Sequence, residues 1–442
     1  MGFIALWIAA TGASVAPAPS IQEVWSHQPS TGWRIIFPGL VDGAGNLYWG
    51  ECNGSGVCDV VSSTRDGAVR YRKPLPGSQR RGFAPGQLTA SAGLVISSAE
   101  NGVVRAFQGA TGAEAWSRDL RADLCDAAPG TSGWLSLQPM VVGRDGNLFL
   151  QANGEPCDAT NLQHGHWILS LESGSGALRW KQRFERPIHG LIADEEGDLY
   201  FESALRSASR QRDRYLISIA PDGYERWRRR KQWSSSPVAA FGGRLFEANR
   251  EAHRTDNGAP LGQLPLHSPW AGERNAFTLV TRDSVYLFGS PKGVCSGPDC
   301  ATRFYRFDAA RRSAACQVTL GRGEGVVLTQ PILTSHGTVL FAQGDGSSPR
   351  LRELSANGDE VRSLPLPAGR YSGPASLVAG RWIAMTDAPA PRIVAFAVPG
   401  AEPNAEGWVT FGGGMARAGR PHGYHGPVAY RGSSERARTE AR

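Results

Sequence analysis

The chain has 442 residues, a formal net charge of +7, 41% hydrophobic residues, 55 Gly and 29 Pro. The hydrophobic fraction is enough for packed sheets, and the density of turn-forming residues excludes a protein built of long helices. The length suits either two or three average domains or a single large one.

The first 20 residues, MGFIALWIAATGASVAPAPS, contain an apolar stretch with small residues and no basic segment before it. We interpret residues 1–20 as a signal peptide for export. The stretch is too short and too interrupted by Gly and Pro for a membrane helix, so no membrane span is expected in the mature protein. No Cys follows the apolar run, and the sequence therefore does not predict a lipid anchor.

From residue 39 onward, one kind of hairpin recurs eight times. Each copy has two strands of alternating apolar residues around a turn of Gly, Asp or Asn, the pattern of an antiparallel hairpin. The segments are 39–50, 87–99, 139–151, 190–202, 237–248, 277–289, 331–343 and 374–386. Their second strands are anchored by Leu47, Leu94, Leu148, Leu199, Leu245, Val285, Val339 and Trp382. The anchors recur about every 48 residues, which is the period of a four-stranded propeller blade.

A second hairpin follows each first one. These segments are 60–71, 104–116, 168–180, 216–227, 252–264, 304–316, 351–362 and a truncated 393–400. Three of them end on Trp116, Trp180 and Trp227, which we expect to be structural residues packed between neighbouring blades. Cys316 stands at the place of this Trp in the sixth unit, so we expect a buried packing residue and not a nucleophile.

The last unit lacks its outer strand, and the N-terminus supplies one. Residues 21–25, IQEVW, read as a strand with no partners before it. The sequence therefore predicts an all-β fold, an eight-bladed β-propeller of four-stranded antiparallel blades. The ring is closed by pairing residues about 21–28 with the blade of 374–398, which leaves no exposed sheet edge at the seam.

The unit resembles the repeat of the PQQ-like (quinoprotein) β-propeller superfamily, which includes BamB-like non-enzymatic members. The matching residues are Thr111, Gly112 and Trp116, then Ser175, Gly176 and Trp180, and the preceding hairpins at 145–149 and 197–200. Residues 407–420 resemble the closing segment of such rings, so we expect a single domain over 21–420 and a basic, disordered tail over 421–442. WD40 and kelch propellers fit less well, because their repeat signatures are missing.

Seven cysteines favour a compartment outside the cytosol. Two short Gly-rich loops each lie between a pair of cysteines, and two further cysteines fall in connections that share one face of a propeller. We therefore expect the disulfides Cys52–Cys58, Cys295–Cys300 and Cys125–Cys157. The alternative is a zinc site built by the two closely spaced pairs.

Few residues suggest catalysis. The resemblance implies, as one alternative, a quinoprotein dehydrogenase, in which adjacent cysteines, Ca²⁺ and a catalytic Asp surround the quinone. No two cysteines are adjacent in this chain. The acids Asp194, Glu195 and Glu196 are expected to be solvated residues of a hairpin turn.

Three further patterns carry little weight. Gly321, Gly323 and Gly325 form a glycine cluster outside any strand-to-helix context, and His164, His166 and Asp158 form a weak candidate for a loop metal site. The basic segment 226–231 is interpreted as a solvated outer strand. We predict no nucleic-acid binding there, because aromatic residues are not interleaved with the basic ones.

We therefore expect a non-catalytic, exported propeller in the periplasm or outside the cell, monomeric and without cofactor or metal. Its loop face would bind a protein or a cell-envelope ligand. The nearest known role within the superfamily is the scaffold propeller of outer-membrane protein assembly, BamB. The interaction loops of that protein have no residue-by-residue match in this sequence, so its role is not transferred. The alternatives are a PQQ-dependent dehydrogenase and a sensor or adhesin domain that binds sugars or peptides.

Overall fold

The computed structural model describes residues 21–75, 88–98, 102–124, 134–155, 165–204, 214–231, 237–247, 251–264, 274–290, 302–308, 314–320, 326–327, 329–344, 347–386 and 390–403. The expected signal segment 1–20, the resemblance at 407–420, the glycine cluster at 321–325 and the tail 421–442 lie outside these residues.

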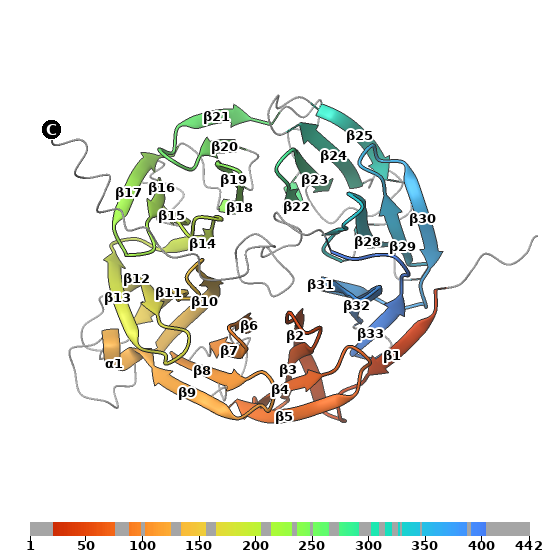
Figure 1. Ribbon diagram of the computed structural model, residues 1–442, viewed down its shortest axis with the longest axis horizontal. Helices are drawn as coiled ribbons and strands as arrows, with labels where there is room; N and C mark the ends of the chain where they lie inside the picture. The colour runs from red at the N-terminus through yellow and green to blue at the C-terminus, as the bar shows by residue number, and fades with distance from the viewer. Residues whose placement is uncertain are drawn as a thin grey trace, which may run out of the picture.

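The described strands form eight antiparallel sheets arranged as a ring, each running from the centre to the rim (Figure 1). This is the eight-bladed propeller predicted from the repeat. All eight anchor residues are buried, because each lies at or next to the start of a second strand covered by neighbouring blades.

The first four blades follow the chain without interruption. Blade one is β2 (Trp33–Val41), β3 (Leu47–Asn53), β4 (Cys58–Ser63) and β5 (Val69–Leu75). Blade two is β6 (Leu88–Ser91), β7 (Leu94–Ser98), β8 (Val103–Gln108) and β9 (Glu114–Asp119). Blade three is β10 (Trp134–Val142), β11 (Leu148–Glu155), β12 (Gly165–Leu171) and β13 (Leu178–Phe184). Blade four is β14 (Ile188–Ala193), β15 (Leu199–Ala204), β16 (Arg214–Ile219) and β17 (Glu225–Arg230).

The other four blades complete the ring. Blade five is β18 (Pro237–Phe241), β19 (Arg244–Glu247), β20 (Glu251–Arg254) and β21 (Pro260–Gln263). Blade six is β22 (Arg274–Val280), β23 (Ser284–Ser290), β24 (Thr302–Asp308) and β25 (Ala314–Leu320). Blade seven is β26 (Val326–Val327), β27 (Ile332–Leu333), β28 (Val339–Gly344), β29 (Arg350–Leu354) and β30 (Glu360–Pro365). Blade eight is β31 (Tyr371–Val378), β32 (Arg381–Thr386), β33 (Arg392–Ala397) and the N-terminal strand β1 (Glu23–His27).

The N-terminal strand closes the ring as predicted. β1 pairs antiparallel with β33, with Trp25 opposite Ala395 and His27 opposite Ile393. In Figure 1 the red start of the described chain lies against the blue last blade. The outer edge of blade eight is therefore covered by a strand from the other end of the domain.

Two local features depart from the simple repeat. Blade seven has its innermost strand in two pieces, β26 and β27, which both pair with β28. Pro331, which has no amide hydrogen, precedes β27, and the Ala342 amide bonds the Thr329 hydroxyl instead of a ladder carbonyl. The described residues also contain one short helix, α1 (Leu120–Leu124), directly after β9. None of their helices has the length and apolar character needed to cross a membrane.

The antiparallel order places two classes of connection on opposite faces of the ring. Turns from first to second and from third to fourth strand lie on one side, which we call the turn face. They are short, as at 143–147 and 172–177 in blade three. Connections from second to third strand and from blade to blade lie on the other side, the connection face. Among the described residues these include the hairpin loop 54–57 and the segment 185–187 between blades three and four.

Neighbouring blades are joined by a repeated tryptophan contact. The indole nitrogen of Trp180 in β13, the outer strand of blade three, donates to the carbonyl of Pro221 at 2.9 Å. Pro221 lies in the turn between the third and fourth strands of blade four. Trp116 makes the same bond to Ser173 at 2.8 Å, and Trp227 to Thr255 at 2.9 Å. Trp25 in the closing strand donates to Arg65 of blade one at 2.9 Å, so the seam uses the same contact.

The turn glycine of the repeat is required by this contact. A Cβ atom on Gly176 would lie 2.6 Å from the Trp116 ring, and one on Gly258 would lie 2.6 Å from the Trp227 ring. Both glycines also have positive φ, +71° and +68°, a region that other residues rarely adopt. The turn Gly of blade three therefore packs against the Trp ring of blade two. The Trp of blade three packs in turn against the Gly of blade four.

Cys316 occupies the equivalent position between blades six and seven. Its sulfur lies 2.7 Å from the carbonyl oxygen of Asn357, and a Cβ on Gly358 would lie 3.0 Å from it. The side chain is half-buried and not buried as we expected, because this position lies on an outer strand, where the equivalent Trp116, Trp180 and Trp227 are half-buried too. Burial raises the pKa of the Cys316 thiol, which disfavours the reactive thiolate.

We predict that Trp180→Ala lowers the free energy of unfolding by roughly 3 kcal/mol, at the lower end of the range for aromatic truncation because the ring is half-buried. Trp180→Phe is the matched control: it keeps most of the packing and loses only the hydrogen bond, at a cost of about 1 kcal/mol. Urea unfolding of the three proteins measures both values. Wild-type stability in Trp180→Ala would contradict a structural role.

Candidate functional site

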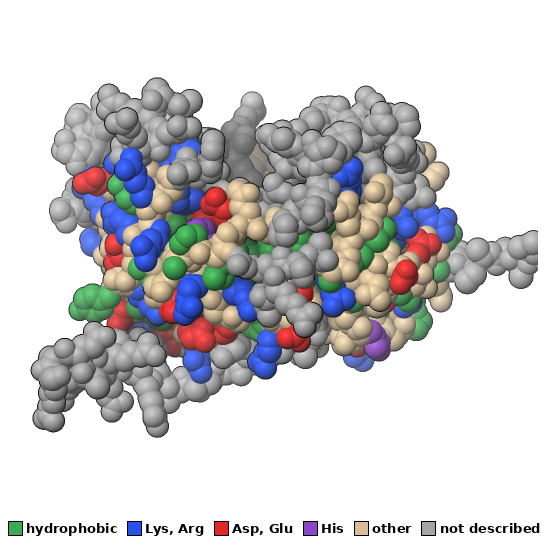
Figure 2. Space-filling view, turned by 90° about the horizontal axis from the view of Figure 1, so that it is seen from above, with side chains coloured by type: hydrophobic (Ala, Val, Ile, Leu, Met, Phe, Trp, Pro, Cys, Tyr) green, Lys and Arg blue, Asp and Glu red, His purple; other side chains and the backbone are tan. Residues whose placement is uncertain are grey.

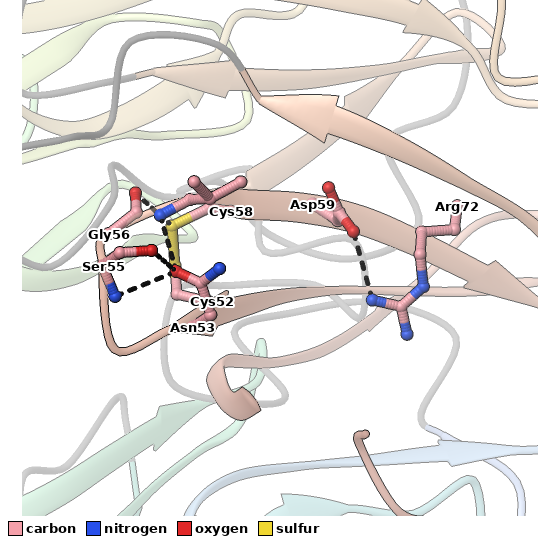
Figure 3. The surroundings of a disulfide bond; sticks show 8 residues. Cys52, Asn53, Ser55, Gly56, Cys58, Asp59 and Arg72 are labelled. Atoms are coloured by element: carbon pink, nitrogen blue, oxygen red, sulfur yellow. Dashed lines mark hydrogen bonds and ion pairs between the residues drawn. A yellow bond between two sulfur atoms is a disulfide. The ribbon is translucent and has the colours of Figure 1, made fainter. Parts of the chain in front are cut away.

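The connection face carries one disulfide among the described residues, at the end of the β3–β4 hairpin. Cys52 and Cys58 are opposite each other in the register and are bonded, as we predicted (Figure 3). The Asn53 side-chain oxygen accepts bonds from the amides of Ser55 and Val57, both at 3.0 Å. The bond excludes this pair from the alternative zinc site and fixes the shape of a loop that projects from the connection face.

A buried carboxylate lies next to this loop, where the ring closes. Glu51 in β3 has no exposed surface, and its Oε1 is 2.6 Å from His27 Nε2 and 2.7 Å from Trp49 Nε1. Its Oε2 is 2.7 Å from Arg72, whose other guanidinium nitrogen is 3.1 Å from Asp59. We call these five residues the seam cluster. His27 belongs to blade eight and the other four to blade one, so the cluster links the two blades across the closure.

The electrostatics of the seam cluster favour an ionised glutamate. Burial raises the pKa of Glu51, but hydrogen bonds from His27, Trp49 and Arg72 outweigh it and hold the pKa below its ordinary value. The Arg72 guanidinium also lies over the Trp33 ring, 5.4 Å from its centroid. The fold therefore uses a buried, compensated charge to hold the closing strand.

A second buried carboxylate lies on the connection face between blades four and five. Glu247, at the end of β19, has a fully buried side chain, and its Oε2 is 2.7 Å from Lys231 Nζ. Its Oε1 is 3.4 Å from His253 Nε2 in β20. The ligand atoms of Glu247, Glu251 and His253 lie within 4.8 Å of one another, so these three residues form a group that could hold a metal ion.

Polar side chains occupy related positions in three more blades. Gln151 in β11 donates to the Ile188 carbonyl of the next blade, and Gln343 in β28 donates to Leu320 of the preceding blade at 3.2 Å. Glu202 in β15 is 1% exposed, and its Oε1 has no hydrogen-bond partner among the described residues. Second strands thus carry a buried acid or amide near the connection face in five blades. Sequence reasoning missed these residues, although each interrupts an apolar strand.

The other predicted site residues divide into those described and those not. Trp116, Trp180 and Trp227 lie at the blade junctions described above. Cys125, Cys157, Cys295 and Cys300 lie outside the described residues, as do His164 and Asp158 of the loop metal candidate. His166 is described, and its Nδ1 lies 2.9 Å from the Asn153 side-chain oxygen.

The prediction that the turn acids of blade four are solvated is wrong for Asp194. Asp194 is not solvated but 3% exposed, because the turn packs against blade five, where the Gly242 amide bonds Glu195 at 2.6 Å. Asp194 accepts bonds from the amides of Glu196 and Asp198 and, at 2.7 Å, from the Tyr200 hydroxyl. Burial raises its pKa to about 8 despite the Tyr200 bond. The residue braces a turn on the face opposite the seam cluster.

The basic segment forms an outer strand, as predicted. β17 is exposed along most of its length, Arg226 pairs with Asp198, and Arg228 pairs with Glu225 at 2.7 Å. Lys231 departs from this pattern, since its side chain is only 3% exposed beside Glu247. On the surface seen in Figure 2, cationic and anionic side chains are interspersed over the described part of the molecule.

No protein-family model and no curated protein sequence matches the chain. The arrangement of the blades is that of solved β-propellers. BamB from Moraxella catarrhalis matches with a TM-score of 0.53 and 15% identity, over 87% of this chain and 99% of that one. Quinohemoprotein alcohol dehydrogenases from Pseudomonas putida HK5 and Comamonas testosteroni match with TM-scores of 0.53 and 0.52, each at 13% identity and over 77% of their length. At these identities the likeness establishes the fold alone.

The residues present do not fit the quinone site that the resemblance implies. That site needs two adjacent cysteines, and this chain has none. Cys52 and Cys58 are bonded to each other across a hairpin. Asp194, the most buried acid of the turn group, is occupied by two backbone amides and a tyrosine hydroxyl. We therefore derive no chemistry through a quinone.

We predict that Glu51→Gln is destabilising at neutral pH and that its difference from wild type shrinks in acid. The lowered pKa of Glu51 gives stability that is present above its ordinary value of 4.5 and is lost as pH falls through the folded-state value. Chemical unfolding from pH 7 to pH 3 measures this difference. Glu114→Gln, at an exposed acid, is the control, and a pH-independent difference for Glu51→Gln would contradict the account.

Asp194 should show the opposite pH dependence. Because its pKa is raised to about 8, its contribution to stability is complete below the ordinary 3.8 and is lost as pH rises toward 8. We expect Asp194→Asn to gain stability relative to wild type across this interval, since the amide oxygen still accepts the two turn bonds. Asp222→Asn, in an exposed turn, serves as the comparison. A flat difference between wild type and Asp194→Asn would show that the carboxyl titrates normally.

The remaining disulfides stay a prediction. Non-reducing peptide mapping should find Cys125–Cys157 and Cys295–Cys300 beside Cys52–Cys58, with Cys316 free and slow to alkylate. Cys125–Cys157 closes a loop of about 30 residues and would contribute roughly 3–4 kcal/mol. Seven free thiols in protein taken from its native compartment would contradict both this pairing and export.

Proposed function

We propose that this protein is a non-catalytic, exported scaffold that binds a protein partner through its connection face. The observation that carries the proposal is the division between the two faces. Among the described residues, the turn face consists of hairpin turns, whereas the connection face carries the disulfide-bonded loop of the β3–β4 hairpin with the seam cluster next to it. Loops that a rigid scaffold holds in place are where binding residues concentrate.

The chemistry of the connection face favours binding over catalysis. The seam cluster is compensated internally, with Glu51 contacted by an imidazole, an indole and a guanidinium. Such a network orders the hairpin of the disulfide and offers no free base at the surface. Next to it the loop presents Val57, which is 39% exposed, as an apolar contact point.

The extent of the match to BamB supports the same proposal. The propeller accounts for 99% of that chain but only 77% of each dehydrogenase, so those enzymes contain a further part that has no counterpart in this match. The match thus spans nearly all of a BamB-like protein, for which the resemblance implies a scaffold role. A location in the periplasm or outside the cell agrees with the Cys52–Cys58 disulfide.

The test is crosslinking mass spectrometry of the full chain in envelope extract from its source organism, with paired surface variants. We expect one protein to crosslink to the connection face and to be lost in Val57→Glu. Tyr224→Glu is the matched control, since Tyr224 is 76% exposed on the turn face. Equal crosslinking of both variants would contradict the proposed surface. Alcohol oxidation by the purified protein with added PQQ and Ca²⁺ would overturn the non-catalytic assignment.

A further inference from the structure

The hairpin of β19 and β20 brings three potential ligands to one side of blade five. Leu245 in β19 is opposite His253 in β20. Glu247 lies two residues after Leu245 and Glu251 two residues before His253, so all these side chains share one face of the sheet. Neither strand needs to bend for Glu247, Glu251 and His253 to meet, and their ligand atoms lie within 4.8 Å of one another.

The spacing of the two buried ligands suits one ion. His253 Nε2 and Glu247 Oε1 are 3.4 Å apart, which is longer than a charged hydrogen bond of about 2.7–2.9 Å. Two ligand atoms that each lie about 2.0–2.1 Å from a tetrahedral Zn²⁺ are roughly 3.3–3.4 Å apart. The pair therefore has the separation of two ligands that share a metal.

Both groups are buried without hydrogen bonds. His253 is 8% exposed and Glu247 is 1% exposed. Neither imidazole nitrogen and neither carboxylate oxygen has a hydrogen-bond partner among the described residues; the polar contact of Glu247 is its ion pair with Lys231. An unsatisfied buried polar group costs about 1–3 kcal/mol, so a ligand that satisfies both would be stabilising.

The charges of the group also favour a cation. Glu247 and Glu251 bring two carboxylates to the group, and Lys231 is ion-paired with Glu247. Lys231 contacts Oε2 of Glu247 and leaves Oε1 toward His253. The lysine thus orients the carboxylate without occupying the oxygen that faces the imidazole.

We propose that Glu247, Glu251 and His253 form a binding site for a divalent transition metal, with Zn²⁺ as the ion that fits best. One imidazole with two carboxylates is a donor set that Zn²⁺ accepts and that Mg²⁺ and Ca²⁺, which prefer oxygen alone, do not favour. The site joins the two middle strands of blade five at the connection face, beside Lys231 of blade four. It does not depend on the proposed scaffold function.

The experiment is isothermal titration of the full-length protein with Zn²⁺, after its thiols have been alkylated and bound metal removed with chelator. We expect one ion per chain and a rise in the thermal unfolding midpoint with Zn²⁺. His253→Gln and Glu247→Gln should each weaken binding by about tenfold or more. His166→Gln is the matched control, because His166 already contacts Asn153 and lies in another blade. It should bind as wild type does.

X-ray absorption of the Zn²⁺-loaded wild type keeps the test decisive if the variants do not fold. The proposal expects a single imidazole with oxygen ligands and no sulfur. It is overturned if wild type does not bind Zn²⁺, if His253→Gln binds it with unchanged affinity, or if the spectrum shows sulfur or several imidazoles.

Discussion

The ring depends on a contact repeated at Trp25, Trp116, Trp180 and Trp227, where an outer-strand indole of one blade packs on a turn glycine of the next. Each indole buries its apolar surface on the turn and satisfies its nitrogen on a turn carbonyl, as Trp116 does on Ser173. A blade that packs face to face with two neighbours cannot shift without losing the tryptophan–glycine contacts on both of its sides. The same contact at Trp25 makes the N-terminal strand part of the ring rather than an appendage.

The connection face uses a different means of joining blades. There, buried acids and amides reach across the junctions, among them Glu51 with His27 at 2.6 Å and Glu247 with Lys231 at 2.7 Å. Buried charges of this kind are costly unless they are matched, so they fix the alignment of the blades more than they add to stability.

The sequence was sufficient to predict the blades, because alternation, turn glycines and Trp116, Trp180 and Trp227 recur at a steady period. It also predicted the closing strand, from an unpaired segment ending at Trp25. It did not predict the buried clusters, since Lys231 and Glu247 belong to different blades and follow no motif. Asp194 was predicted to be solvated, and that prediction is wrong because its burial depends on the adjacent turn of blade five, which the local sequence does not reveal. The position of Cys316 in the repeat predicted where the tryptophan is replaced, but not that the thiol is only half-buried.

The most direct test of ring closure is hydrogen exchange of the chain that lacks residues 1–30, compared with the full chain. The account predicts that the β33 amides that bond β1 lose their protection and that the truncated protein associates through the freed edge. Unchanged protection of residues 392–397 in a truncated protein that stays monomeric would contradict it.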